Sequence, residues 1–387
     1  MGHSNLTKAA ERSALANAGG ARAGIGGIDH IELFVDDARE SALHYGSAFG
    51  FTTRGQGGPE TGLVGQRSFL MSQAGINLVL TSGLYPEHPA AEYVRRHGDG
   101  VAVIAMEVDD VAAVFGELVA RGARPLCQPQ SYSDSHGSVI VAEVAGVGDV
   151  IHRLVERRDP HGSPIRAGAG GSFLPGVLQP LTGAPVLSEP LVQLIDHFAV
   201  CVPAGELRAT VNFYRTVFGF DEIFAEYIDV ADQGMDSVVV QSTSGLVTFT
   251  LIEPDTSRRP GQVDQFLRDH GGAGVQHLAL ITDDIVDTVS RFTERGVRFL
   301  QTPASYYETL EARVNGVAVP MADLSRLGIL VDRDHWGQLL QIFAESTHDR
   351  RTFFMEVIER RGARLFGSGN IKALYEAKER EMALAPE

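Results

Sequence analysis

From about residue 28, the chain alternates between two hydrophobic patterns. Short runs of apolar and β-branched residues predict buried strands, which in the first half are IDHIELFV, VAVIAMEV, SVIVAEV and DVIHRLVER. Between these runs, ARESALHYGSAFGF and DVAAVFGELVARG have apolar residues at helical spacing and predict helices that end at Gly50 and Gly122. A strand and a helix followed by several strands indicates an α+β fold with curved sheets.

The second half of the chain repeats the pattern of the first. LIDHFAVCV matches GIDHIELFV, GAGVQHLALITDD matches GDGVAVIAMEVDD, and TFFMEVIERRG matches DVIHRLVERRD. Such a repeat indicates tandem modules, and the Gly-, Pro- and Ser-rich segment between them indicates a linker. We therefore expect a disordered leader at 1–26, a first module at 27–158, a linker at 159–192 and a second module at 193–387.

The two copies differ at positions that carry chemistry. Three strands of the second copy hold side chains that bind metals: His197, His277 and Glu356. The matched positions of the first copy hold His30, Val103 and Arg153, and the arginine would repel a cation. Two histidines and one carboxylate form the facial triad of non-haem iron(II) oxygenases, which leaves coordination positions open for substrate and O₂. We therefore expect one metal site, in the second module.

Each of these side chains also has a purely structural explanation. A lone buried histidine is more often a hydrogen-bonded core residue than a ligand, and Glu356 in the apolar run TFFMEVI could pair with Arg360. A glycine-rich turn follows this strand, and then a short helix from Ile371 that Ser368 or Asn370 can cap. A buried acid with a helix returning over it is typical of a covered metal site.

Composition narrows the classes of function. The formal net charge is −16 and the pI is near 5.3, which argues against nucleic acid and anionic membranes as partners. Cys127 and Cys201 form neither a metal-ligand spacing nor a disulfide framework. No apolar run approaches the roughly 20 residues of a membrane span. We therefore expect a cytoplasmic protein.

Several stretches resemble the 4-hydroxyphenylpyruvate dioxygenase family: DHFAV, GAGVQHLAL, TPASYYETL, ILVDRD followed by LLQIF, FFMEVIER and FGSGNIKALYEA. The resemblance extends from about residue 28 to 382. It implies two tandem vicinal-oxygen-chelate modules built from βαβββ repeats, Fe(II) as the cofactor, and 4-hydroxyphenylpyruvate and O₂ as partners. The iron ligands that it implies are the same three residues: His197, His277 and Glu356. We also expect a homodimer.

Two features of the sequence resemble those of one branch of this family, which hydroxylates the benzylic carbon and forms 4-hydroxymandelate and CO₂ for antibiotic biosynthesis. The other branch forms homogentisate and typically has an asparagine in an INEP motif, where this chain has Ile252 in LIEP. That branch also typically has GNF and a following phenylalanine, where this chain has Asn370-Ile371 and Tyr375. The resemblance therefore implies 4-hydroxymandelate as the product.

The resemblance also implies a set of substrate contacts. Some would contact polar atoms of the substrate and others would pack its ring: Ser237, Thr250, Gln262, Gln341, Phe343, Phe366, Asn370, Ile371 and Tyr375. We expect the C-terminal helix to close over the substrate as a lid, and the extra chain at about 301–328 of the second copy to wall off a pocket.

Three other functions remain possible from the sequence. The nearest is the homogentisate-forming dioxygenase, which the residues at Ile252 and Ile371 oppose. The second is a metal-free binding or resistance module of the same fold. The third is a glyoxalase-like isomerase that uses Zn or Ni and consumes no O₂.

Overall fold

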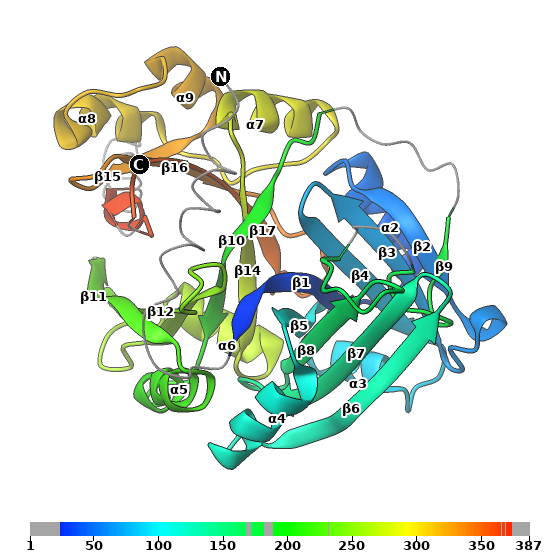
Figure 1. Cartoon of the computed structure of the whole chain (residues 1–387). Coiled ribbons are helices and arrows are strands. Elements are labelled where there is room, and N and C mark those ends of the chain that lie inside the picture. Colours follow the sequence, from blue (N-terminus) through cyan, green and yellow to red (C-terminus); the bar gives the residue numbers. More distant parts are fainter. Residues whose placement is uncertain are drawn as a thin grey trace.

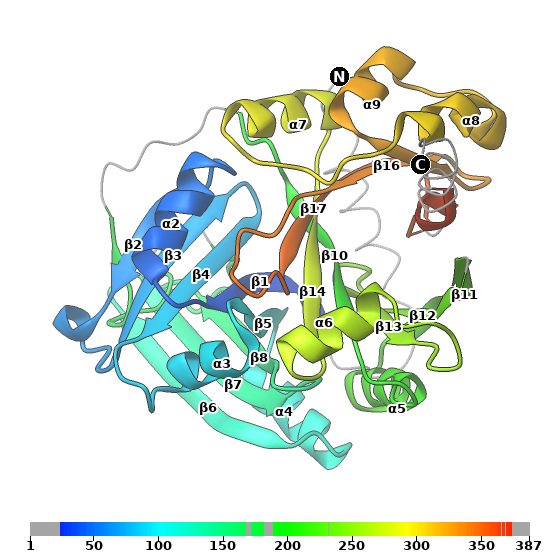
Figure 2. The same ribbon diagram turned by 180° about the vertical axis from the view of Figure 1, so that it is seen from behind.

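The computed structural model describes residues 24–167, 172–181, 189–230, 232–364, 366–367 and 369–373. Within these residues, the chain forms two curved sheets, one from each half, which lie side by side (Figures 1 and 2). The first strand begins at Ile25, so the expected leader at 1–26 ends two residues too late, because Ile25 is buried and pairs with Val108. Residues 1–23 lie outside the described residues.

The first module consists of two βαβββ units. Its elements are β1 (Ile25–Phe34), α2 (Ala38–Ser47), β2 (Thr52–Gly57), the short turn η1 (Pro59–Thr61), β3 (Gln66–Gln73), β4 (Ile76–Gly83), α3 (Pro89–His97), β5 (Gly100–Val108), α4 (Val111–Ala120), β6 (Pro125–Asp134), β7 (Gly137–Ala145), β8 (Ile151–Arg158) and β9 (Gln179–Pro180). The strands of its sheet lie in the order β6-β7-β8-β5-β1-β4-β3-β2-β9.

The second module repeats this plan with an insertion between α7 and β15. Its elements are β10 (Leu194–Cys201), α5 (Leu207–Phe213), the π-helical turn η2 (Tyr214–Phe218), β11 (Asp221–Val230), β12 (Gln233–Gln241), β13 (Thr248–Pro254), α6 (Gln262–His270), β14 (Gly274–Ile281), α7 (Ile285–Glu294), α8 (Ala304–Val314), α9 (Met321–Leu327), β15 (Leu330–Arg333), β16 (Gln338–Phe343) and β17 (Phe354–Arg361). Its strand order is β11-β12-β13-β10-β14-β17-β16-β15. The extra chain of the second copy forms α8 and α9 (Figure 1).

The strand register supports the internal repeat. In the first module, β1 pairs antiparallel with β5, and Glu32 lies opposite Val103. In the second module, β10 pairs antiparallel with β14, and Ala199 lies opposite His277. Val103 and His277 therefore occupy equivalent places in the two sheets. The expected α+β fold with tandem vicinal-oxygen-chelate modules is confirmed.

The segment expected as a linker at 159–192 belongs partly to the first module. Its residues 179–180 form β9, which extends the first sheet by pairing with β2. Leu178 is buried and packs against Leu70 and Val79 of that sheet. The Gly- and Pro-rich composition predicted an irregular chain, but apolar residues within it still find a sheet surface to cover.

The two modules share a buried interface. One hydrophobic core includes residues of both, and the rings of Phe49 and Phe292 meet in it with centroids 5.2 Å apart. On the other side of the interface, His152 of β8 is fully buried, and its Nε2 lies 2.9 Å from the Tyr214 hydroxyl. The rings of Phe218 and Phe249 also pack around His152. The modules are therefore expected to unfold cooperatively.

His152 predicts acid sensitivity of this interface. Burial lowers the pKa of His152 from 6.5 to about 3, so the folded protein keeps it neutral at pH values where the unfolded chain protonates it. This residue's contribution is fully present above about pH 6.5 and is lost as the pH falls from there toward about 3. We expect the free energy of unfolding to fall by about 2 kcal/mol between pH 7.5 and pH 5 from this residue alone.

Urea unfolding at the two pH values measures the effect, with His152→Gln as the comparison. Glutamine can still bond to Tyr214 but does not titrate, so the pH-dependent loss should shrink by about 2 kcal/mol. His270, whose pKa burial lowers to about 4, titrates in both proteins and cancels from the comparison. An equal pH dependence in the two proteins would contradict the assignment to His152.

Candidate metal site

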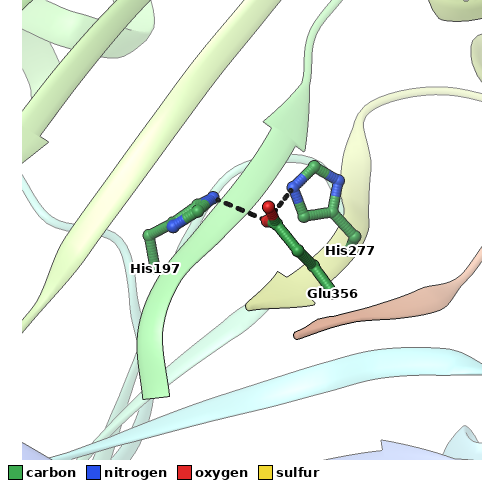
Figure 3. Close-up of side chains that lie close together, drawn as sticks. All are labelled: His197, His277 and Glu356. Atoms are coloured by element: carbon green, nitrogen blue, oxygen red, sulfur yellow. Dashed lines mark ion pairs between the residues drawn. The ribbon is translucent and has the colours of Figure 1, made fainter. Parts of the chain in front are cut away.

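Three neighbouring strands of the second sheet bring His197, His277 and Glu356 together. The Nε2 atoms of both histidines lie 3.4 Å from the same oxygen of Glu356, on either side of the carboxylate (Figure 3). All three residues are at most 9% exposed. The three ligand atoms lie within 4.8 Å of one another.

The strand register explains why these side chains converge. Ala199 lies opposite His277, and Ala279 lies opposite Glu356. Paired residues, and residues two apart on one strand, project to the same face of a sheet. His197 on β10, His277 on β14 and Glu356 on β17 therefore point from adjacent strands toward one volume on the concave face.

Asp196 orients the first histidine. A β-bulge occurs between Ile195 and His197 and turns the Asp196 side chain toward the ring, so that its carboxylate lies 2.9 Å from His197 Nδ1. Arg360 donates two hydrogen bonds of 2.7 Å to the same carboxylate. Burial raises the pKa of Asp196, but the Arg360 guanidinium outweighs it and holds the pKa well below its usual range. Asp196 therefore stays ionised and directs His197 Nε2 toward Glu356.

Arg360 pairs with Asp196, and not with Glu356 as in the structural explanation considered from the sequence. Among the described residues, Glu356 forms ion pairs with His197 and His277 and with no arginine or lysine. A buried carboxylate without a cationic partner is costly unless a metal neutralises it. The structure therefore favours the metal interpretation over the structural one.

His277 has its own partners. Its Nδ1 lies 3.1 Å from the Gln276 amide oxygen, and Phe354 stacks on its ring with centroids 5.1 Å apart. Burial lowers the pKa of His277, although the Glu356 carboxylate acts in the opposite direction. A neutral imidazole whose Nδ1–H is held by an acceptor presents the Nε2 lone pair, as a metal requires.

The donor set fits a divalent transition metal. Two ligands bound at about 2.1 Å to one cation and at near a right angle lie about 3 Å apart, close to the two contacts of Glu356. Two imidazoles and one carboxylate with further open positions are typical of non-haem iron(II). These residues can therefore hold iron(II), and the acid would supply the only negative charge of the triad.

The first module has a different arrangement at the equivalent place. Arg153 lies opposite Ala105, as Glu356 lies opposite Ala279 in the second module. Its guanidinium contacts His30 Nε2 at 3.2 Å and forms ion pairs with Glu32 and Glu143 at 2.9 and 2.8 Å. The arginine therefore occupies the position from which a cation would be held, consistent with the expectation of a first module without metal.

Two of the predicted substrate residues share the face of the metal-binding side chains. Thr250 lies opposite Ala199, two residues from His197, and Ser237 lies opposite Ile252, two residues from Thr250. Ser237 and Thr250 are both buried. Thr250 Oγ1 makes no hydrogen bond with any described residue. A buried hydroxyl without a partner is unfavourable, so a polar group of a bound ligand fits here.

Strand β16 contributes Gln341 and Phe343 on the other side of the triad. Phe343 lies opposite Glu356, and its ring packs edge-on against His277 with centroids 5.8 Å apart. Gln341 is two residues away on the same face and is 2% exposed. The structure thus places both residues beside the candidate metal site.

The C-terminal segment is anchored by Asn370. Asn370 is fully buried, donates through Nδ2 to Gln341 Oε1 at 3.2 Å, and accepts a 2.7 Å hydrogen bond from the Tyr306 hydroxyl. Residues 369–373 are helical, and in both views they lie beside β15 and near α8 (Figures 1 and 2). The Asn370 side chain is therefore used in these hydrogen bonds, so it does not cap the helix, contrary to one of the two expectations. Ser368, the other expected cap, lies outside the described residues.

The glycine turn before this helix is sterically required. Gly367 has a φ of +80°, and a Cβ there would lie 2.0 Å from Gln341 Oε1. A Cβ on Gly369 would lie 2.6 Å from Asp332 Oδ1. Tyr306 belongs to the inserted helix α8, so the extra chain of the second copy supports the returning segment through Asn370.

The remaining predicted residues are placed as follows. Phe366 is half-buried, with its ring edge-on to His197 at 5.5 Å and under the Arg360 guanidinium at 5.0 Å. Ile371 packs, together with Ile252, against a buried cluster that includes Cys201. Gln262 is exposed at the start of α6, and Tyr375 lies outside the described residues.

Several supporting residues were missed by the sequence analysis. They are Asp196, Gln276, Tyr306 and Phe354. The pairing of Asp196 with Arg360 had a signal, because both copies contain the dipeptide Asp-His on the first strand and Arg-Arg at the end of the last strand. No comparable signal exists for Tyr306, since the inserted helices have no counterpart in the first copy.

Comparisons with known proteins agree with this geometry. The family model of the Glyoxalase/Bleomycin resistance protein/Dioxygenase superfamily matches residues 27–165 and 194–342. 4-Hydroxyphenylpyruvate dioxygenases from Neurospora crassa and Dictyostelium discoideum are each 33% identical over 92% of this chain, and the matches cover 92% and 98% of those proteins. The solved structure of a triply substituted 4-hydroxymandelate synthase from Streptomyces coelicolor is 42% identical, with a TM-score of 0.82, over 93% of this chain and 99% of that one. The chain is a dioxygenase and belongs to the 4-hydroxyphenylpyruvate dioxygenase family within that superfamily.

Proposed function

We propose that this enzyme is a 4-hydroxymandelate synthase that uses iron(II) and O₂. It would convert 4-hydroxyphenylpyruvate and O₂ into 4-hydroxymandelate and CO₂, with one oxygen atom entering the new carboxylate and the other the benzylic hydroxyl. The observation that carries the choice of branch is that Ile252 and Ile371, far apart in sequence, pack against the same cluster. The 42% identity with a 4-hydroxymandelate synthase supports the same choice.

The metal-binding side chains also suit the charge of the substrate. His197 Nε2, His277 Nε2 and a Glu356 oxygen would hold the iron, which supplies the redox centre at which O₂ and a 2-oxo acid react. One carboxylate leaves a divalent cation with a net charge of about +1. Because Arg360 is committed to Asp196, the charge that balances this excess is the substrate's own carboxylate.

The side chains beside these ligands are partly apolar and partly polar. Phe343 and Phe366, which contact His277 and His197, offer faces against which an aromatic ring can pack. Thr250, Ser237 and Gln341 offer polar atoms on the same face of the sheet, and Thr250 Oγ1 lacks a partner among the described residues. Phe366 and the anchored turn at Gly367 cover the metal-binding side chains and limit the entry of water.

The product test has a specific variant. We expect the wild type to release 4-hydroxymandelate and CO₂, and Ile371→Phe to divert part of the flux toward ring-hydroxylated product or uncoupled 4-hydroxyphenylacetate. A larger, flat side chain in the Cys201 cluster would restrict how the substrate ring can turn, and about 1.4 kcal/mol between two ring orientations changes a product ratio tenfold. Chromatography of the products formed from 4-hydroxyphenylpyruvate, iron(II) and O₂ measures the ratio.

Ile223→Phe is the matched control, because it makes the same substitution at an exposed site on β11 and should leave the products unchanged. Homogentisate as the main wild-type product would overturn the choice of branch and favour the activity named for the curated relatives. Absence of O₂ consumption would instead favour the isomerase or the metal-free binding module. Unchanged products in Ile371→Phe would refute the role assigned to Ile371.

The cysteines and the helices bear on the cellular setting. Cys127 and Cys201 are both free thiols, as expected for a reducing cytoplasm. In the described part of the chain, no helix is long and apolar enough to cross a membrane. We propose a homodimer in solution, which light scattering tests directly.

A further inference from the structure

The first module contains a cavity of about 490 Å³ on the concave face of its sheet. Strands β2 to β4 and β6 to β8 form its walls, and the segment that follows β8 covers part of it. Apolar walls come from Leu70, Val139, Phe173 and Leu178. A volume of this size is typical of sites for small organic ligands.

The segment that covers this cavity has a counterpart in the second module. Phe173 packs edge-on against His30 at 5.2 Å and lies under the Arg157 guanidinium at 4.4 Å. Phe366 has the same relation to His197 and Arg360 in the second module. The segment that follows each module's last strand thus places a phenylalanine over its own sheet. The cavity of the first module is therefore covered in the same way as the metal-binding side chains of the second module, although Arg153 stands in place of the metal ligand.

Among the described residues, every charged side chain that lines this cavity except one lies near a charge of opposite sign. Arg157 forms two hydrogen bonds of 2.6 and 2.8 Å with Asp29, and Arg158 pairs with Glu156. Arg166 lies 3.9 Å from Glu107, and the one acid in the lining, Asp134, lies 3.6 Å from His136.

Arg54 is half-buried in the lining, and its guanidinium has no hydrogen bond or ion pair with any described residue. A single guanidinium without a partner among the described residues, in a cavity that has both polar and apolar walls, suits a monoanion with a flat carboxylate better than a phosphate dianion.

We propose that this cavity is a second ligand site, which binds a small aromatic carboxylate through Arg54. The ring would lie against Phe173 and Leu178, and the carboxylate would pair with the Arg54 guanidinium. Ser72 and Ser138 also line the cavity, and their hydroxyls could form hydrogen bonds with polar substituents of the ring. This site is independent of iron and of the reaction in the second module.

Photolabelling of the metal-free protein tests the proposal. The probe is 4-azidobenzoate, an aromatic carboxylate that attaches to nearby residues on illumination, and peptide mass spectrometry locates the label. We expect labelling within 54–77 and 137–180, protection by excess 4-hydroxyphenylacetate, and binding of 4-hydroxyphenylacetate about tenfold weaker by calorimetry in Arg54→Gln. Arg67→Gln is the matched control, because Arg67 lies on neighbouring β3 and pairs with Glu60.

Two comparisons decide the result. The uncharged probe 4-azidobenzamide should label the first module much less than 4-azidobenzoate, and this comparison uses only the wild-type protein. Labelling confined to the second module, equal labelling by both probes, or calorimetric affinity unchanged in folded Arg54→Gln would each overturn the proposal. Loss of iron-dependent turnover bears on the proposed function alone, because the photolabelling uses metal-free protein.

Discussion

We expect Glu356→Gln to bind no iron(II) and to lose turnover by more than about 100-fold. Removing a residue that only hydrogen-bonds a metal ligand costs up to about 100-fold, and loss of a ligand itself should cost more. The substitution removes the negative charge between His197 and His277 and keeps the shape of the side chain. Metal analysis should give one iron per wild-type chain and none in the variant. A residual full equivalent of iron in Glu356→Gln would contradict the site.

Stability measurements separate loss of metal from loss of fold. A ligand that binds the native state raises its melting temperature, so iron(II) should stabilise the wild type and leave Glu356→Gln unaffected. Without metal, the variant should melt no lower than the wild type, because Glu356 is 2% exposed and forms no ion pair with an arginine or lysine among the described residues. Functional carboxylates often carry such a cost in stability.

Glu143→Gln is the control in the other module. Glu143 lies opposite Arg153 in the first sheet, and Phe343 lies opposite Glu356 in the second, so Glu143 and Phe343 occupy equivalent positions. Its loss should weaken the ion pairs of Arg153 without changing the iron content or the iron-dependent shift in melting temperature. Two irons per wild-type chain would show that the first module also binds metal and would refute the interpretation of Arg153.

The internal repeat explains how much of the site the sequence could predict. His277 and Glu356 stood out because the matched positions in the first copy are Val103 and Arg153, and the strand register places each pair equivalently. A lone histidine or acid in a strand would have carried no such information. Gln341 and Phe343 were expected from the family resemblance, and the strand register places both on the face of the metal-binding side chains.

Other parts of the site depend on geometry that local sequence does not encode. Arg360 was a reasonable partner for Glu356, four residues away on the same strand, yet it pairs with Asp196. The bulge at Asp196 causes this difference, because one extra residue in β10 turns the carboxylate toward the arginine. The sequence also did not predict that Phe173 and Phe366 are equivalent. The segments that contain them differ in sequence, but each ring packs edge-on against the histidine of its own module's first strand.

The pairing of Arg360 with Asp196 gives the second large prediction. We expect Arg360→Gln to lower the free energy of unfolding by about 3–5 kcal/mol, because it leaves the Asp196 carboxylate with no cationic partner in a mostly buried place. We also expect the affinity for iron(II) to fall by about 10- to 100-fold, because Asp196 would no longer hold His197 in one orientation. Urea unfolding of the metal-free protein and iron titration measure the two effects separately.

The first module offers a matched control in Arg157→Gln. Arg157 pairs with Asp29, which contacts His30 Nδ1 at 2.6 Å, so the same arrangement recurs without a metal-binding triad. Asp29 also sits at a bulge, between Ile28 and His30, and the Arg157 guanidinium outweighs its burial and holds its pKa below the usual range. Arg157→Gln should therefore lower stability to a similar extent but leave the affinity for iron(II) unchanged.

The comparison of the two arginine variants separates structural support from support of the metal. If both lose stability and only Arg360→Gln loses iron affinity, the pair formed by Asp196 and Arg360 positions His197 for the metal. Equal loss of iron affinity in both variants would mean that general destabilisation weakens the site. In acid, the pair's stabilisation should persist above the ordinary pKa of aspartate, near 3.8, and decline as the pH falls below it, because the folded pKa is depressed. As the pH falls below that value, the difference in stability between Arg360→Gln and the wild type should therefore shrink.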